Sequence, residues 1–176
     1  MPTRVVPPAM KILASQLRAA RALLDKSQED VAGWVNLDQQ EISRWEGAKY
    51  KLLSSDGVEL QKAFEKKGIE FLPASETMGA GVRWRKPGTE DKFRRAQFRA
   101  ARAMANLSMR DIEDTYRVNR NFVTKLENGK IKALNLETIR SLEAAFRQEN
   151  IELTPEADAW GAGVRWRVPD GTVSLD

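Results

Sequence analysis

The chain of 176 residues contains no cysteine and no histidine. Their absence excludes disulfides, the usual zinc sites, cysteine nucleophiles and histidine general bases. No run of apolar residues approaches the roughly 18 needed to cross a bilayer, and the opening MPTRVVPPAM lacks the apolar core of a signal peptide. Gly-rich phosphate loops and clusters of metal ligands are also missing from the sequence. We therefore expect a cytoplasmic protein that is not an enzyme and has no cofactor, metal or membrane partner.

What the sequence does contain is an ordinary globular composition, with 41% hydrophobic and 31% charged residues. The net charge is +4. This basicity is mild, but it suits a nucleic-acid-binding protein if the Lys and Arg side chains gather on one face.

The sequence also repeats itself at an offset of about 80 residues. GAGVRWR occurs without a change at 79–85 and 161–167, and QLRAARA at 16–22 matches QFRAARA at 97–103. We therefore predict two related domains, 11–87 and 92–169, which are called the first and second unit below. Between them, KPGTED carries the Pro and Gly that are typical of a boundary.

Each unit has the pattern of several helices followed by two short strands. Ser27 and Asp30 have the spacing of a capping box and open a second helix, and Asp38 can cap a third, 39–46. Asn36, in the turn between these two helices, tolerates a positive φ. After the fourth helix the apolar period changes to two, which predicts strands at 69–72 and 82–85.

Two short helices joined by a tight turn are typical of a helix-turn-helix. The stretches SQEDVAGWVNLDQQEISRWEGAK (27–49) and SMRDIEDTYRVNRNFVTKLENGK (108–130) resemble the Xre (Cro-like, phage-repressor-like) DNA-binding domain. The resemblance implies a mainly α fold of two tandem repressor-like domains with four to five helices each. Both would end in short β-strands. The predicted core of the two motifs is Val31, Val35, Leu37, Ile42 and Trp45, with Ile112, Tyr116, Val118, Val123 and Leu126 as counterparts.

The resemblance also assigns the polar face of each third helix to base edges in the major groove of double-stranded DNA. Gln and Asn can bond adenine, and Arg can bond guanine. The predicted base-contacting residues are Gln39, Gln40, Glu41, Ser43 and Arg44 in the first unit, and Arg120, Asn121, Phe122, Thr124 and Lys125 in the second. The alternative is that these are solvated helix faces.

Phosphate contacts are expected beside these helices, because helix amino ends and lysines favour anions. The predicted residues are Gln28, Lys49, Lys51, Lys130 and Lys132. The resemblance further implies two structural ion pairs, one joining Arg21 to Glu46 and the other joining Arg102 to Glu127.

Three residues of the second unit depart from the pattern. Glu113 stands where the first unit has Ala32, and Met109 replaces Gln28. Arg117 replaces Asn36 in the turn, where a positive φ strains a residue with a full Cβ. A second unit that serves mainly as a dimerisation half is the alternative that these changes favour.

The identical heptapeptide needs a separate explanation, because the predicted base-reading positions share no residue between the units. A short strand leaves an unpaired edge unless something covers it. Our hypothesis is that the two tails pair in a shared sheet, with Trp84 and Trp166 packed near a pseudo-twofold axis and the arginines directed to solvent or DNA. In the competing interpretation, the Arg-Trp pairs bind single-stranded nucleic acid, with Trp stacked on bases and Arg on phosphates.

The predicted function is that of a sequence-specific transcriptional regulator in which one chain replaces a homodimer. Because its halves differ, its operator should be asymmetric, with half-sites about 34 Å apart. RNA polymerase is a candidate partner, and further homodimerisation stays open. The alternative function is a protein-interaction module, anti-activator or antitoxin-like, whose second unit has lost DNA binding.

Overall fold

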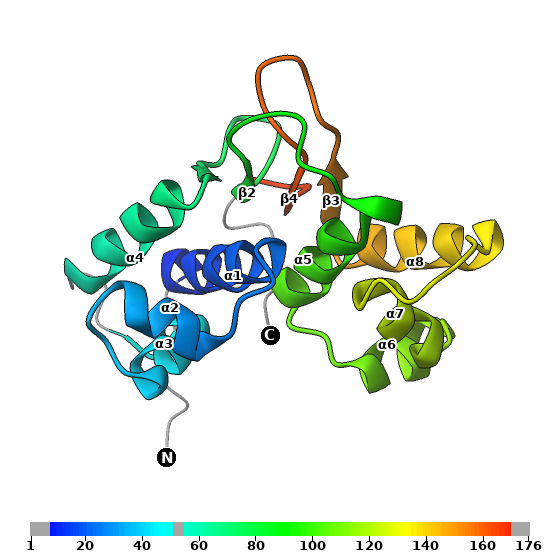
Figure 1. The fold of residues 1–176 in the computed structure, drawn as a ribbon, viewed down its shortest axis with the longest axis horizontal. Helices are drawn as coiled ribbons and strands as arrows, with labels where there is room; N and C mark the ends of the chain where they lie inside the picture. Colours follow the sequence, from blue (N-terminus) through cyan, green and yellow to red (C-terminus); the bar gives the residue numbers. More distant parts are fainter. Residues whose placement is uncertain (1–7, 51–54, 170–176) are drawn as a thin grey trace.

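The computed structural model describes residues 8–50 and 55–169. Within these residues each unit has four α-helices followed by two β-strands (Figure 1). The first unit contains α1 (Pro8–Leu23), α2 (Gln28–Trp34), α3 (Gln39–Glu46), α4 (Ser55–Lys66), β1 (Ile69–Leu72) and β2 (Gly81–Trp84). The second contains η1 (Lys92–Arg94), a 3-10 helix, then α5 (Arg95–Ala105), α6 (Met109–Tyr116), α7 (Arg120–Glu127), α8 (Leu136–Gln148), β3 (Ile151–Thr154) and β4 (Gly163–Trp166). The fold is mainly helical, as predicted.

Local side-chain hydrogen bonds explain where the short helices begin. The Ser27 hydroxyl accepts from the backbone N–H of Asp30 at 3.1 Å, and the Asp30 carboxylate accepts from the backbone N–H of Ser27 at 2.9 Å. Ser108 and Asp111 form the same capping box at the start of α6. These bonds satisfy backbone donors that an α-helix leaves free at its first turn. The predicted box is confirmed.

The described strands form one antiparallel sheet in the order β1-β2-β4-β3. The two copies of the heptapeptide meet at its centre, where Val82 lies opposite Val164 and Gly81 lies opposite Arg165. Because both copies run through the same register in opposite directions, each strand covers the edge that its twin would leave open. The predicted shared sheet is confirmed, and it joins the two units.

The glycines of the heptapeptide are needed for this close pairing. A Cβ added to Gly81 would lie 2.3 Å from the Arg165 Cβ, and one added to Gly163 would lie 2.1 Å from the Val82 carbonyl oxygen. Such distances leave no room for a side chain. The glycines are therefore identical in the two copies because each copy is the partner of the other.

The two tryptophans of the heptapeptide are core residues. Trp84 is 8% exposed and Trp166 is 2% exposed, and the Trp166 indole N–H donates to the Ser15 hydroxyl at 3.0 Å. A buried indole cannot stack on a base, so the burial disfavours the single-strand interpretation.

The intervening arginines lie on the opposite face of the sheet, because side chains alternate along a strand. Arg83 forms an ion pair with Glu70 at 2.8 Å and lies over the Trp160 ring, and Arg165 donates to the carbonyl oxygens of Gly79 and Pro73. These arginines are half-buried and occupied by the protein itself. The expectation that the arginines of the heptapeptide point to solvent or DNA was therefore wrong for Arg83 and Arg165, whereas Arg85 and Arg167 are exposed.

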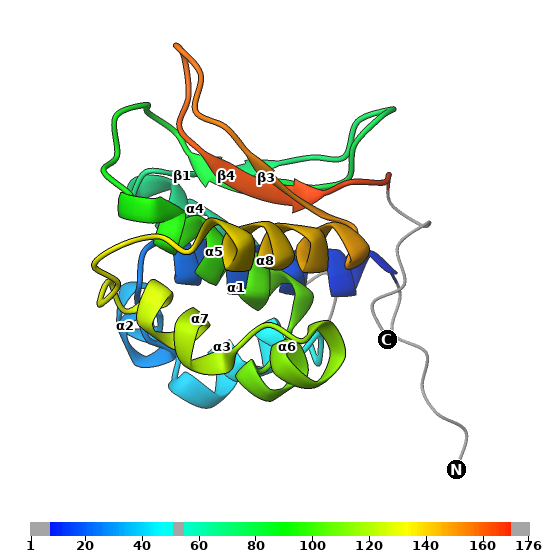
Figure 2. The same cartoon turned by 90° about the vertical axis from the view of Figure 1, so that its right-hand side faces the viewer.

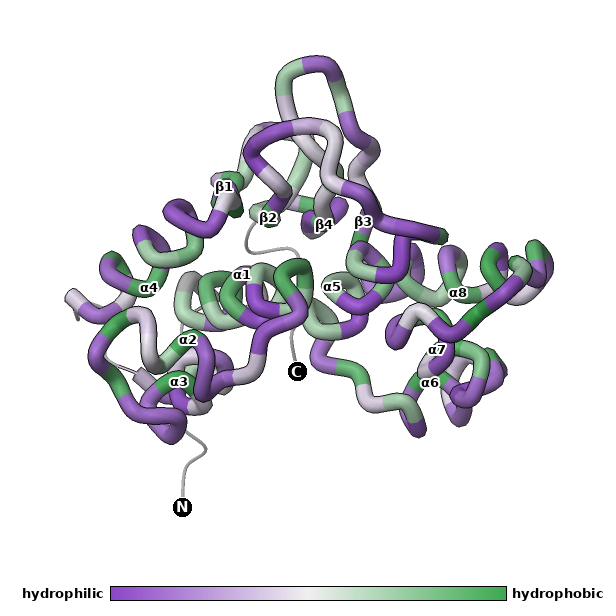
Figure 3. The backbone as a smooth tube through the Cα atoms, in the orientation of Figure 1, coloured by the Kyte–Doolittle hydropathy of each residue, from purple (hydrophilic) through white to green (hydrophobic). Residues whose placement is uncertain are grey.

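The elements are stacked in three layers. Figure 2 shows the sheet on one side, α1, α4, α5 and α8 in the middle, and α2, α3, α6 and α7 on the other side. Helices α1 and α5 meet at the centre, where both carry hydrophobic residues (Figure 3). The core of both units is thus continuous through the junction.

All ten predicted core residues of the two motifs face the interior. Val35, Leu37 and Tyr116 are partly buried and pack against the core, whereas the other seven are buried.

Candidate nucleic-acid interface

The predicted base-reading residues of the first unit lie on α3. Gln39, Gln40, Ser43 and Arg44 are exposed along this helix. Glu41 is half-buried, and its carboxylate accepts from the backbone N–H of Asp38 at 3.3 Å. That contact belongs to the capping box of α3, so Glu41 has a structural role beside any contact with a base.

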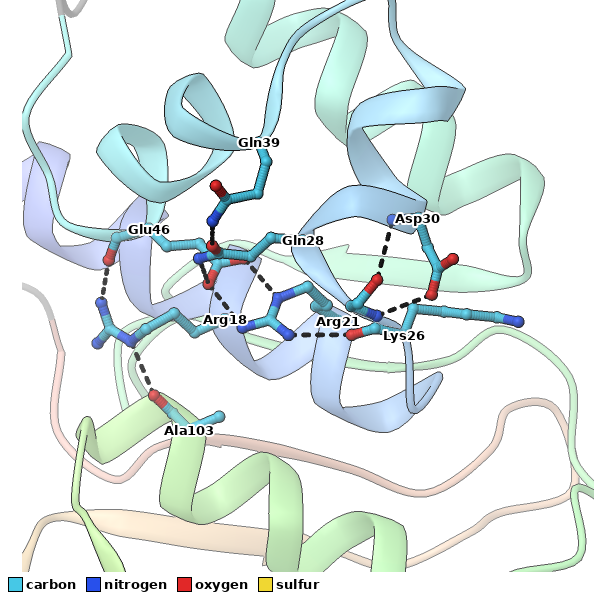
Figure 4. Close-up of polar contacts among 9 residues, drawn as sticks. Arg18, Arg21, Lys26, Gln28, Asp30, Gln39, Glu46 and Ala103 are labelled. Carbon is cyan, nitrogen blue, oxygen red and sulfur yellow. Dashed lines mark hydrogen bonds and ion pairs between the residues drawn. The ribbon is translucent and has the colours of Figure 1, made fainter.

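A chain of hydrogen bonds holds Gln39 in place (Figure 4). The Gln39 amide donates to the Gln28 amide oxygen at 2.6 Å, and the Gln28 amide donates to the Glu46 carboxylate at 3.1 Å. Arg21 completes the chain with two bonds to Glu46, at 2.7 and 2.9 Å. Because Gln28 is fixed from behind, the Gln39 side chain is oriented before any partner arrives.

The two ion pairs that the resemblance implied are present. Arg102 binds Glu127 in the second unit as Arg21 binds Glu46 in the first, with paired bonds of 2.7 and 2.8 Å. Both carboxylates are buried. The hydrogen bonds that Arg102 donates to Glu127 raise the pKa of Arg102, burial lowers it, and the Glu127 charge also raises it. These charged pairs connect α1 to α3 and α5 to α7.

The second unit presents α7 differently. Arg120, Asn121, Thr124 and Lys125 are exposed, and the Thr124 hydroxyl donates to the backbone oxygen of Arg120 at 2.9 Å. Phe122 is half-buried and packs against the core. Four of the five predicted residues are therefore exposed, whereas Phe122 mainly holds α7 to the domain.

Glu113 contacts Arg120 directly. Its carboxylate accepts from the Arg120 backbone N–H at 3.1 Å and lies 3.6 Å from the Arg120 Nε. A larger residue at the Ala32 position is thus accommodated by directing its carboxylate to the first residue of α7. The contact partly neutralises the charge with which Arg120 could approach DNA.

The other two departures also have structural consequences. Arg117 has φ of 59°, close to the 53° of Asn36, so the strained turn conformation is retained. Met109 is half-buried and packs against the core, and it offers no counterpart to the polar bridge that Gln28 forms. In the second unit the Arg120 side chain therefore lies beside the Glu113 carboxylate, and the residue at the Gln28 position, Met109, makes no polar contact with it.

The predicted phosphate-contacting residues fall into three groups. Lys49, Lys130 and Lys132 are exposed. Gln28 is half-buried and bonded on both sides, as described above. Lys51 lies outside the described residues.

Two arginines that the sequence-based prediction missed set the position of α3 and α7. Arg18 donates to the backbone oxygens of Ala103 and Met104 on α5, at 2.8 and 2.9 Å, and to that of Glu46 at the end of α3, at 2.6 Å. Burial lowers the pKa of Arg18, and the Glu46 charge opposes this. Figure 4 shows this guanidinium between the two units.

Arg99 makes the equivalent contacts from α5. It donates to the backbone oxygen of Ala22 on α1 at 2.8 Å and to that of Glu127 at the end of α7 at 3.0 Å. Each arginine thereby joins the presenting helix of its own unit to the neighbouring unit. The signal in the sequence was the second repeated motif, QxRAARA, in which these arginines occupy the same position.

The glutamines of the same motif fix the sheet to the helices. Gln16 donates to the backbone oxygens of Leu72 and Gly81, and Gln97 donates to those of Thr154 and Gly163. Both side chains are buried. The motif therefore connects the presenting helices, the central helices and the sheet in one arrangement.

Comparison with known proteins adds no further assignment. No protein-family model, curated protein or solved structure matches this chain. Within 8–50 and 55–169, no helix is long and apolar enough to cross a membrane, and no group of acidic side chains could hold a metal ion.

A groove lies between the units, beside the hydrogen-bonded chain described above. Its volume is about 480 Å³, and its lining includes Gln28 and Ser43 from the first unit and Arg99 and Arg102 from the second. Both units thus contribute to one continuous surface next to α3.

Proposed function

We propose that the protein binds double-stranded DNA in a sequence-specific manner and regulates transcription, as a tandem helix-turn-helix protein that resembles the Xre family. The observation that carries this proposal is that α3 and α7 lie on the same side of the protein. Both lie on the side of the central helices that is opposite the sheet (Figures 1 and 2). Two polar helices on one side of a rigid body suit successive major-groove faces of a duplex.

The first unit would read bases mainly through Gln39 and its neighbours on α3. A glutamine amide can both donate to and accept from adenine, a pairing worth about 1–3 kcal/mol of discrimination. The hydrogen bond that the Gln39 amide donates to the Gln28 amide oxygen supports this role, because an oriented side chain loses less conformational entropy on binding. In the second unit, Arg120 suits guanine and Asn121 suits adenine.

The two halves would recognise different sequences, because α3 and α7 share no residue at these positions. We therefore expect an asymmetric operator whose half-sites lie about 34 Å apart, one helical turn. The sheet and the arginines Arg18 and Arg99 support a fixed spacing, since both connect the units through the protein interior.

A selection from random duplexes tests the proposal, followed by gel shifts at two salt concentrations with competitor DNA. Gln39→Ala should relax sequence preference in one half-site, and Arg120→Ala in the other. Arg85→Ala is the matched control, because Arg85 is exposed at the end of β2, on the sheet side. Selected sites that are perfect inverted repeats, or equal losses in Arg120→Ala and Arg85→Ala, would contradict the proposal.

The second candidate function is an interaction module in which only the first unit retains contact with DNA. The contact of Glu113 with Arg120 and the loss of the glutamine bridge at Met109 favour it. The same experiment separates the two. If Gln39→Ala weakens binding while Arg120→Ala leaves every selected position unchanged, the second unit does not read DNA.

A further inference from the structure

A groove of about 570 Å³ lies between the end of α2 and the face of α4 in the first unit. Its apolar lining is formed by Trp34, Val35 and Ala63. The Trp34 ring is fixed edge-on against Phe64, with a distance of 5.6 Å between ring centroids. The groove therefore has a firm hydrophobic floor that is open to solvent.

Positive charge surrounds this floor. Lys62, Lys66 and Lys67 line the groove, and Lys67 Nζ lies 4.9 Å from the centroid of the Trp34 ring. Among the residues that the structure describes, none of these lysines forms an ion pair with a carboxylate. Glu59 is the acidic residue of the lining. Three cations against one anion leave the groove basic.

An exposed apolar side chain extends the same face of α4. Val58 is 53% exposed and precedes Lys62 by four residues, so the two lie on one side of the helix. Most apolar side chains of this size are buried in the fold. The face thus combines apolar area with lysines, as a protein-binding surface does.

In the second unit, the positions that correspond to the three lysines lie within the described residues and carry no basic side chain. Tyr116 stands where the first unit has Val35, and Glu149 stands where it has Lys67. The Tyr116 hydroxyl hydrogen-bonds to the Glu149 carboxylate and joins α6 to α8 at this place. Lys62 and Lys66 correspond to Ala144 and Gln148. The second unit therefore reaches the same fold with a hydrogen bond where the first unit has the groove. An open basic groove is thus not needed for folding.

We propose that the groove binds an acidic segment of a partner protein, one that carries a large apolar side chain among its carboxylates. The lysines complement the carboxylates, and the floor of Trp34, Val35 and Ala63 accommodates the apolar side chain. A DNA backbone fits less well, because its phosphates are not accompanied by a large apolar side chain that could fill the floor. The site is separate from α3 and α7, and it does not depend on the proposed DNA binding.

Fluorescence anisotropy of a labelled peptide tests this proposal with the full chain at low ionic strength. The probe is a run of aspartates with a central pair of leucines, and a second probe has serines in place of the leucines. The test variant is Lys62→Glu with Lys66→Glu. The matched control is Arg140→Glu with Arg147→Glu, which makes the same change of charge on exposed positions of α8. Melting curves and a duplex gel shift accompany each variant.

The leucine probe should bind the wild type, and the α4 variant should weaken it about tenfold, while the α8 variant changes it less than twofold. The serine probe should bind several times more weakly than the leucine probe. Equal losses in both variants, or equal binding of both probes, would overturn the proposal by showing general charge attraction. It would also fail if the α4 variant loses duplex binding and keeps the peptide, since the lysines would then contact DNA.

Discussion

Val82 lies opposite Val164 at the centre of the sheet, so that residues 81–83 of one heptapeptide pair with residues 163–165 of the other in the opposite direction. An interface between identical segments is self-complementary, as in a twofold-symmetric dimer. Here both segments belong to one chain. A substitution in one copy therefore faces the unchanged residues of the other copy. For this reason we expect substitutions in β2 or β4 to lower the free energy of unfolding.

Gly81→Ala should destabilise the protein by about 2–3 kcal/mol, because the added Cβ overlaps the opposite strand and forces it to move. The distances to the Val164 carbonyl oxygen and the Arg165 Cβ would both be 2.3 Å. Denaturant unfolding measures the loss. The control is Gly33→Ala on α2, where an added Cβ meets nothing within 4 Å. That change should stabilise the protein by up to about 1 kcal/mol. Similar effects of both changes would contradict the tight pairing.

Arg18→Met should lower the free energy of unfolding by about 2–4 kcal/mol, because it leaves backbone oxygens of α3 and α5 without their charged donor. It should also weaken binding to a selected duplex beyond what the fraction unfolded explains, since α3 would lose its connection to the second unit. Calorimetry and gel shifts measure these two effects.

The control for Arg18→Met is Arg110→Met, an exposed change of the same kind on α6. It should leave the free energy of unfolding within about 0.5 kcal/mol of the wild type. A variant Arg18→Met that melts as the wild type does would show that Arg18 does not hold the units together.

The helices and the shared sheet could be predicted because their signals are local or repeated. Capping boxes at Ser27 and Ser108 need only residues three positions apart. The identical heptapeptide indicated self-pairing, since two segments that pair with each other must satisfy one set of constraints. The ion pair of Arg21 with Glu46 was available only through the resemblance, and the geometry confirms it.

The contacts that fix α3 and α7 could not be predicted in this way. Arg18 and Arg99 donate to backbone oxygens. Every residue has such an oxygen, so the sequence does not indicate which residue accepts the bond. The resemblance placed Phe122 among the base-contacting residues by its position on the third helix, whereas its side chain is half-buried and packs against the core. The contact of Glu113 with Arg120 depends on the turn between α6 and α7, where Arg117 has a positive φ.

The capping boxes also predict how stability depends on pH. Hydrogen bonds from Ser27 lower the pKa of Asp30, and those from Ser108 lower the pKa of Asp111. A carboxyl group whose pKa is lowered by folding stabilises the protein above its unfolded pKa, about 3.9, and this contribution disappears as pH falls through the lowered value. Asp30→Asn with Asp111→Asn should therefore melt below the wild type at pH 6, and the difference should shrink towards pH 2.5. A constant difference between the two melting temperatures would contradict this.

Glu113→Gln should strengthen binding to a selected duplex by about threefold to tenfold, because it removes a negative charge beside Arg120 and frees that guanidinium for a phosphate or a base. The affinity should also depend more steeply on salt. Glutamine keeps an oxygen that can accept from the Arg120 backbone N–H, so the start of α7 should be preserved. Asp158→Asn provides the same change of charge on the exposed β3–β4 loop, away from α7, and should change affinity less than twofold. If both variants strengthen binding equally, the gain reflects net charge alone. If Glu113→Gln has no effect while Gln39→Ala still weakens binding, α7 does not lie against the duplex, and the first unit alone carries recognition.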